Sequence, residues 1–362
     1  MWFSPKDIHP KETIVLKDIH GYVLPHAGTK YTGEIISHTL RFKPSKYFTH
    51  VLIVYSSSHE QPNINNKYYH EYYVVWKSID YFIRHRWNIR HPIVFIDYNV
   101  RFKNEADFAQ LYKSLNITRT LCVISADFSH YLPMAQAIEL ENCAAHCVIH
   151  KSFDNKCSNV IDTRRAFDIM NMLIPKQWEY QWIGRTRSPG KKAVGYLSFL
   201  MRDEYKPIAY KINGYFITVY SDDMEAHECL GKWTNNIKWS IAKERAFLKE
   251  VIRKGNSTSR LTRGLHKRPI KYWTITYLFG DNRHFIRGWH GIKHNAFYLP
   301  NVLLEHTFNN GKWFDSDKDT VWPPTDRFQM KDTLDKLNIK SNISSSNKNI
   351  TLYNSSIKTG IV

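Results

Sequence analysis

Histidines and carboxylates follow short apolar runs in the first half of the chain, where they could bind a metal ion or transfer protons. His26 follows the run GYVLP, and His59 follows VLIVYSSS. Asp127 and His130 come shortly after the run LCVIS. A neutral imidazole is both a good ligand for divalent metals and a proton acceptor near pH 7. A single histidine is more often structural, but three in a similar context indicate a common site.

The apolar runs predict the buried strands of an α/β fold. They occur at 21–25, 51–55, 93–98, 121–125 and 193–201. Segments of helical length and partial helical periodicity lie near 34–42, 71–84, 105–115, 134–152 and 164–173. This alternation predicts a mixed or mostly parallel sheet flanked by helices. Because side chains just beyond the carboxyl ends of such strands converge on the crevice where ligands bind, His26, His59 and Asp127 are expected to share one site.

The chain is expected to contain two domains and a tail. A charged stretch that ends in proline, RDEYKP, predicts a boundary near residue 204. Beyond it, strand-like runs at 214–220 and 272–279 enclose an amphipathic helix near 238–253, which is typical of a smaller α+β domain. Ser and Asn dominate the C-terminal end, so we expect disorder there. The predicted domains are 1–204 and 205–340, and the predicted tail is 341–362.

The composition limits the class of protein and its partners. The 362 residues carry a net charge of +18, which favours a polyanionic partner such as RNA. The first twenty residues lack the apolar core of a signal peptide, and no stretch approaches the roughly 18 apolar residues of a membrane span. We therefore expect a cytoplasmic protein without membrane contact. Five cysteines, an odd number in a long chain, predict reduced thiols rather than a disulfide framework.

Three segments resemble, in order, the signature segments of the Memo family. They are PHAGTKYTG (25–33), VYSSSHE (54–60) and ISADFSHY (124–131). The Memo family is similar to class III extradiol ring-cleaving dioxygenases, whose active site holds non-heme iron. The resemblance implies an α/β fold of that type. It also implies that His26 and His59 are metal ligands and that Asp127 and His130 form an acid–base pair in the cleft.

The third metal ligand implied by the resemblance is Asp162. Aligning VIDTRRAF (160–167) with the family's Cys-Gly-Arg segment puts this aspartate in the position of the cysteine. Two histidines and one carboxylate are the facial set of ligands that binds non-heme Fe(II). Cys157 is the alternative ligand, and its thiolate would shift the preference toward copper. Asp162 could instead be the N-cap of a helix that begins at Arg164.

Two other segments leave alternatives open. KYYHEYYVVW (67–76) looks like a shortened remnant of a longer family insertion, in which His70 and Glu71 could keep part of a role in substrate recognition. Between residues 143 and 150, two cysteines and two histidines occur at helical spacing. A single helix rarely supplies four tetrahedral zinc ligands, so a buried structural role is the simpler interpretation.

The second domain resembles the Ammecr type. RGWHGIKHNAFYLP (287–300) is similar to its Gly-x-x-Gly-Ile and Tyr-Leu-Pro signature, and HECLGKW (227–233) to a weakened Arg-Gly-Cys-Ile-Gly segment. Memo-like and Ammecr-like domains are known as fused or neighbouring partners, often beside a radical-SAM protein, in systems suspected of modifying RNA or another biomolecule. Arg283, Arg287 and Trp289 would fit base stacking and phosphate contacts, although core packing explains them as well.

Two classes of function follow. The first is a metal-dependent oxidoreductase that uses Fe(II), or copper as the alternative, on an unknown small molecule or modified biomolecule. In it His26, His59 and Asp162 would bind the metal, while Asp127 and His130 would move protons. The second is a non-catalytic adaptor that binds a ligand or RNA, with a degenerate cleft and no metal. The net charge and the basic, acid-free stretch 253–269 support the second class.

Overall fold

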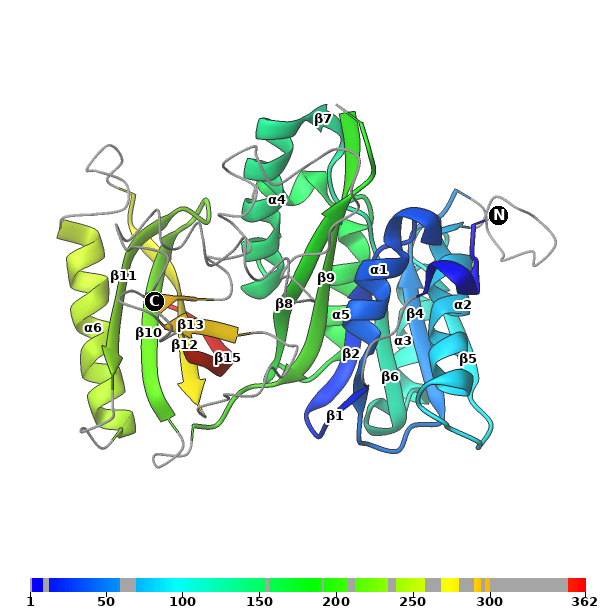
Figure 1. Cartoon of the computed structure of the whole chain (residues 1–362), viewed down its shortest axis with the longest axis horizontal. Coiled ribbons are helices and arrows are strands. Elements are labelled where there is room, and N and C mark those ends of the chain that lie inside the picture. The colour runs from blue at the N-terminus through cyan, green and yellow to red at the C-terminus, as the bar shows by residue number, and fades with distance from the viewer. Residues whose placement is uncertain are drawn as a thin grey trace. The chain divides into compact units, whose positions relative to one another are not determined.

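The computed structural model describes eleven stretches of the chain, which form two compact units (Figure 1). Described residues up to Asp203 belong to the first unit, and those from Glu204 belong to the second. The stretches are 2–8, 13–58, 70–153, 156–190, 192–207, 212–233, 239–257, 268–279, 290–293, 297–299 and 351–362.

The first unit is built on a seven-stranded mixed sheet, which confirms the expected α/β fold. The strand order is β5-β4-β6-β2-β9-β7, and β8 pairs with β9. Four strands run parallel: β2 (Ile19–Leu24), β4 (His50–Tyr55), β5 (Val94–Asn99) and β6 (Thr120–Ser125). The other three are β9 (Lys192–Asp203), antiparallel to β2, and its two antiparallel neighbours β7 (His130–Pro133) and β8 (Trp178–Arg187).

Helices flank this sheet as predicted. They are α1 (Thr29–Leu40), α2 (His70–His85), α3 (Glu105–Ser114), α4 (Met134–Ile149) and α5 (Arg164–Leu173), with short turns η1 (Pro5–Asp7), η2 (Ile117–Arg119) and η3 (Lys156–Val160). A small parallel pair, β1 (Ile14–Leu16) and β3 (Phe42–Pro44), completes the unit. α1 packs against β8 and β9, and α5 packs against β4 and β6. Because helices cover the sheet, all residues of β6 are buried, which explains its continuous apolar run.

The strand β8 was not predicted, because its sequence lacks the continuous apolar run expected of a buried strand. WEYQWIGRTR mixes aromatic, polar and charged residues, yet every residue of the strand is buried. Arg185 and Arg187, which are fully inaccessible to solvent, both pair with Glu141 of α4. A pairing partner distant in the sequence therefore allows this strand to lie in the interior.

The second unit is an antiparallel sheet with a helix on one face, which agrees with the expected smaller α+β unit. Its order is β11-β10-β12-β15-β13-β14. The strands are β10 (Ile212–Ser221), β11 (Ala226–Trp233), β12 (Ile270–Phe279), β13 (His290–Lys293), β14 (Phe297–Tyr298) and β15 (Thr351–Ile361). The helix α6 (Ile241–Ser257) buries Phe247 and Val251 against Ile217, Val219 and Ile275 of β10 and β12.

The prediction of a disordered tail is wrong for residues 351–361. These residues form β15, which pairs antiparallel with β12 from Tyr272↔Ile361 to Phe279↔Asn354. Ser355 and Ser356 are buried in it. The backbone ladder with β12 supplies the order that composition alone does not indicate.

Several predicted features lie outside the described residues. They include His59, the middle of the basic stretch (258–267), Arg283, Arg287, Trp289 and residues 341–350. Of the two Ammecr-like segments, HECLGKW falls on β11, whereas much of 287–300 is outside. No helix in the described stretches is long and apolar enough to cross a membrane.

Candidate functional site

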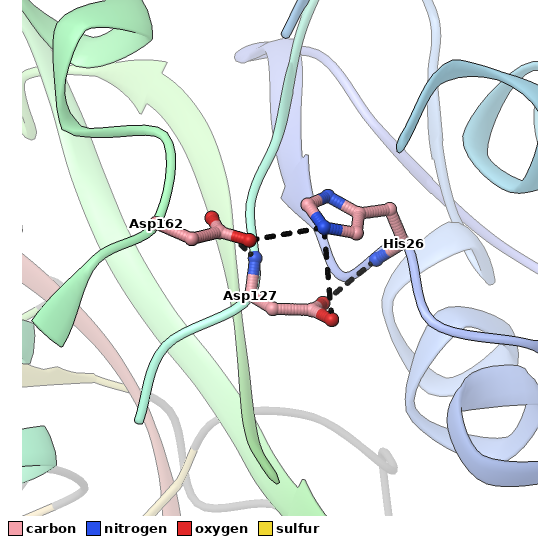
Figure 2. Close-up of side chains that lie close together, drawn as sticks. All are labelled: His26, Asp127 and Asp162. Carbon is pink, nitrogen blue, oxygen red and sulfur yellow. Dashed lines mark hydrogen bonds and ion pairs between the residues drawn. The ribbon is translucent and has the colours of Figure 1, made fainter. Parts of the chain in front are cut away.

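Two neighbouring parallel strands bring His26 and Asp127 together. β2 and β6 pair in register from Gly21↔Cys122 to Leu24↔Ser125, and each of these side chains follows its strand by two residues. Asp162 lies in the turn before α5. Figure 2 shows the three side chains facing one another, with the imidazole in contact with both carboxylates.

The contacts fix all three residues relative to one another. The His26 Nε2 atom lies 3.0 Å from Asp162 Oδ2 and 3.7 Å from Asp127 Oδ2. The backbone N–H of His26 donates to Asp127 Oδ1 at 2.9 Å. The two loops are also joined directly, because the Asp127 N–H donates to Asp162 Oδ1 at 3.0 Å and the Asp162 N–H donates to the Asp127 carbonyl at 3.2 Å. The cluster is therefore held by backbone as well as side-chain hydrogen bonds.

Ser125 orients the His26 ring, a role that the sequence analysis missed. The Ser125 hydroxyl donates to the backbone carbonyl of Glu71 in α2, so its oxygen is free to accept a second hydrogen bond. That oxygen lies 3.1 Å from His26 Nδ1. The Nδ1–H can then donate to Ser125, which leaves Nε2 directed at the carboxylates. Such fixing of one ring nitrogen is typical of a histidine that presents the other to a metal ion.

The electrostatics of the cluster are those of a buried cation between two anions. Burial by itself would lower the pKa of His26, but the Asp127 and Asp162 carboxylates raise it to about 10. Burial also raises the pKa of Asp127 to about 6, against the attraction of His26. The Asp162 side chain is 25% exposed, whereas that of His26 is 4% exposed. The cluster is therefore reached from solvent on the Asp162 side.

The donor atoms fit a single divalent metal ion. Among the described residues, His26, Asp127 and Asp162 each offer a ligand atom, and these atoms lie within 4.8 Å of one another. Nitrogen and oxygen ligands bind at about 2.0–2.2 Å, so two of them on one ion lie roughly 3–3.7 Å apart. The two distances from His26 Nε2, 3.0 and 3.7 Å, match this separation. One imidazole and two carboxylates suit Fe(II), Mn(II) or Zn(II).

The competing assignments for the third ligand are resolved in part. Cys157 forms a disulfide with Cys143 of α4, with Cα atoms 5.5 Å apart, so it offers no thiolate and the reason for preferring copper is removed. The prediction of reduced thiols is wrong for this pair, because a pairing across 14 residues depends on how α4 and η3 pack. Thr163, rather than Asp162, occupies the N-cap of α5, and the Asp162 carboxylate contacts His26, Asp127 and the Thr163 hydroxyl.

His130 is not part of the group of three. It begins β7, its side chain is exposed, and its Nδ1 lies 2.8 Å from the carbonyl of Phe128. It is close enough for its charge to lower the pKa of Asp127. His70 is the first residue of α2, and the charge of the next residue, Glu71, helps to raise the pKa of His26. Glu71 therefore acts on the site through charge and through its carbonyl.

A buried ion-pair network supports the loop that carries Asp127. The Ser129 hydroxyl and the Arg187 guanidinium donate to Glu141 Oε1, and Arg185 donates to Oε2. Gly195 of β9 makes two backbone hydrogen bonds to this loop. Its carbonyl accepts from the Phe128 N–H at 2.9 Å, and its N–H donates to the Ser129 carbonyl at 2.8 Å. A Cβ at this glycine would overlap the Glu141 carboxylate. The close approach of β9 thus depends on a residue without a side chain.

No family model matches this chain, and no curated protein matches its sequence. The geometry of the cluster and the ordered motifs are therefore the basis for a functional conclusion.

Proposed function

We propose that the first unit is a metal-dependent oxidoreductase of the Memo type that holds Fe(II) on His26 and Asp162, with His59 as the third ligand. The observation that carries the proposal is the 3.0 Å separation between His26 Nε2 and Asp162 Oδ2, two predicted ligand atoms. Together with His59 they would make the set of two histidines and one carboxylate that non-heme iron prefers. When bound in such a set, Fe(II) leaves open positions for O2 and an oxidisable substrate.

The remaining residues position the ligands and handle protons. Asp127 holds the backbone of His26 through Oδ1, and its other carboxylate oxygen faces the ring. Because its pKa is raised to about 6, this carboxyl can exchange a proton near neutral pH. His130, exposed on the same loop, is the proposed partner that passes protons to and from solvent.

The motif resemblances support the same proposal. The three Memo-like segments carry two of the three described residues proposed to bind or flank the metal, His26 and Asp127. The Ammecr-like segments of the second unit extend the proposal to a substrate that is a small molecule or a modified biomolecule. They also extend it to a radical-SAM protein as partner.

The experiment is a measurement of Fe(II) bound per chain after anaerobic reconstitution and desalting. We expect about one ion for the wild-type protein and a loss of binding in His26→Ala and in Asp162→Asn, because the first removes the nitrogen ligand and the second removes the negative charge of the carboxylate ligand. His85→Ala and Asp97→Asn are matched controls, because both side chains are exposed and outside the cluster. Unchanged stoichiometry in His26→Ala would exclude this site, provided that the variant unfolds like the wild type.

One observation favours a second function, that of a ligand-binding adaptor without a metal. Part of the negative charge of the cluster is balanced without a metal, since protonated His26 pairs with Asp162 and lies near Asp127. A degenerate cleft in a ligand-binding adaptor would look the same. In that case the wild-type protein would bind no Fe(II), and His26→Ala would lower stability without any change in metal content.

A further inference from the structure

Three loops at the amino ends of β4, β5 and β6 form one continuous surface. The Thr49 N–H donates to the Arg119 carbonyl at 3.0 Å, and the Val94 N–H donates to the Thr49 carbonyl at 2.9 Å. His91 Nε2 lies 2.7 Å from the Phe48 carbonyl. The segments before these three strands are therefore held side by side, at the amino ends of the parallel strands (Figure 1). His26 and Asp127 follow the carboxyl ends of β2 and β6 and so belong to the other end of the sheet.

The segments that build this surface contain cations and no acids. Residues 41–50, 84–93 and 113–120 include eight lysines and arginines and not one aspartate or glutamate. Two of the lysines are bound inward: Lys43 donates to the Trp87 carbonyl and Lys46 to the Thr120 carbonyl. They link the segments and add positive charge beneath the surface.

Three arginines on the surface are exposed and not neutralised. They are Arg86, Arg90 and Arg119. Within the described part of the chain, none of the three forms an ion pair with a carboxylate. Arg84, one helical turn before the loop, differs because Asp80 binds it at 2.7 Å. Unpaired guanidinium groups on one surface concentrate positive potential and attract polyanions.

An exposed aromatic ring lies among these cations. Tyr47 is 57% exposed, although a large apolar ring on a surface is usually partly covered. Its centroid lies 4.4 Å from that of the His91 ring, and the Arg119 guanidinium lies 5.8 Å from it. The bond from His91 to the Phe48 carbonyl holds the imidazole in place. The surface thus combines a fixed aromatic platform with adjacent unpaired arginines.

We propose that this surface, formed by Tyr47, His91, Arg86, Arg90 and Arg119, binds single-stranded nucleic acid. Bases stack on exposed aromatic rings, and arginines contact the phosphates on either side. A duplex would use the cations but not the ring, because its bases are already stacked. An anionic membrane would likewise need only the cations, and would favour an apolar face beside them. The inference does not depend on the metal site, which involves none of these residues.

The test is binding of the full chain to a fluorescent single-stranded RNA of about 12 nucleotides, at salt concentrations from about 50 to 200 mM. The triple variant Arg86→Ala/Arg90→Ala/Arg119→Ala should bind about 10- to 100-fold more weakly. Its slope of log affinity against log salt should fall by about 2. Tyr47→Ala should weaken binding about fivefold or more, whereas Tyr47→Phe keeps the ring and should bind like the wild type.

The matched control removes the same charge elsewhere. Lys243→Ala/Arg245→Ala/Lys249→Ala takes three exposed cations from α6. An equal loss of affinity in both triple variants would mean that net charge, rather than this surface, binds RNA, and would overturn the proposal. So would the absence of binding at low salt, or loss in neither variant. Duplex RNA, single-stranded DNA and vesicles containing phosphatidylserine are the other probes. Tighter binding to duplex or vesicles than to single strands would overturn the assignment of the partner.

Discussion

At the carboxyl ends of β2 and β6, ionisable side chains are buried and face one another, whereas at the amino ends of β4, β5 and β6 three arginines are exposed to solvent. His26 and Asp127 are each 3% exposed. Burial lowers the pKa of His26, but the Asp127 and Asp162 carboxylates raise it above its ordinary value, whereas burial raises the pKa of Asp127 against the attraction of His26. Tyr47, the centre of the opposite surface, is 57% exposed. One end of the sheet is thus suited to a small ion or a proton, and the other to a large, flexible anion.

Helix direction explains part of this difference. α2 and α3 end at the amino side of the sheet, and their last turns carry Arg84, His85 and Lys113. Cations there are stabilised by the negative end of the helix dipole. Arg90 and Arg119 lie outside these helices, in the connections to β5 and β6, so the dipole does not account for them. Among the residues that the structure describes they have no carboxylate partner, which is the basis for proposing a ligand there.

The largest expected effect on stability is that of breaking the buried ion-pair network of Glu141 with Arg185 and Arg187. Glu141→Ala leaves the Arg185 and Arg187 guanidinium groups buried without their anion, which should lower the free energy of unfolding by about 3–5 kcal/mol. Denaturant unfolding measures this change. Glu139→Ala, two residues away on an exposed face of α4, should change it by less than about 0.5 kcal/mol. Equal effects of the two substitutions would show that the network does not stabilise this region.

The disulfide between Cys143 and Cys157 should stabilise the same side of the first unit. It closes a loop with a sequence separation of 14, for which loop entropy predicts about 3 kcal/mol. Reductant should lower the unfolding free energy of the wild type by that amount and should leave the Cys143→Ser/Cys157→Ser variant unchanged. Oligonucleotide binding at the opposite end should be the same with and without reductant. An unfolding free energy of the wild type that does not change with reductant would contradict the pairing of Cys143 with Cys157.

A buried histidine in the turn after α4 provides a pH test of the cost of burial. Burial, with a smaller effect of His146, lowers the pKa of His150 to about 3. At pH values below the ordinary 6.5, the unfolded chain therefore binds a proton that the folded chain rejects. Stability should fall as the pH decreases from about 6.5 toward 3, by at most about 1.4 kcal/mol per pH unit. His150→Gln should reduce this slope, and the exposed His85→Gln should not. Identical slopes in the two variants would contradict the assignment.

The smallest expected effect on stability is that of removing the exposed arginines at the amino ends of β4, β5 and β6. Arg86→Ala, Arg90→Ala and Arg119→Ala should each change the unfolding free energy by no more than about 0.5 kcal/mol, because these side chains are exposed and form no ion pair within the described stretches. The same denaturant series measures it. A loss of 2 kcal/mol or more, roughly the range of a buried interaction, would mean that these arginines are structural.

Much of the fold could be predicted because its strands are locally distinctive. The runs that became β2, β4, β6 and β9 are mostly apolar on both faces, as expected for strands covered by helices, and the shorter apolar run of β5 lies at the sheet edge. The strands β8 and β15 could not be predicted in this way. The charges of β8 are neutralised by Glu141, and the serines of β15 are ordered by pairing with β12, so both depend on residues far away in the sequence.

The candidate site could be predicted to a similar extent. Motif order and strand ends pointed to His26, Asp127 and Asp162, which the structure brings together. Ser125 and Glu141 were missed, because a serine inside an apolar run and a glutamate inside a helix carry no local sign of their partners. The disulfide was missed for the same reason. Pairing of Cys143 with Cys157 depends on the packing of α4 against η3.

The central claim is that His26 and Asp162 bind one metal ion through nitrogen and oxygen. X-ray absorption at the iron edge of the reconstituted protein tests it most directly, because it reports the atoms bound to the ion. We predict nitrogen and oxygen ligands at about 2.0–2.2 Å with an imidazole contribution and no sulfur in the wild type, and no bound iron in His26→Ala after desalting. A sulfur ligand at about 2.3 Å, or an iron spectrum unchanged by His26→Ala, would contradict the claim.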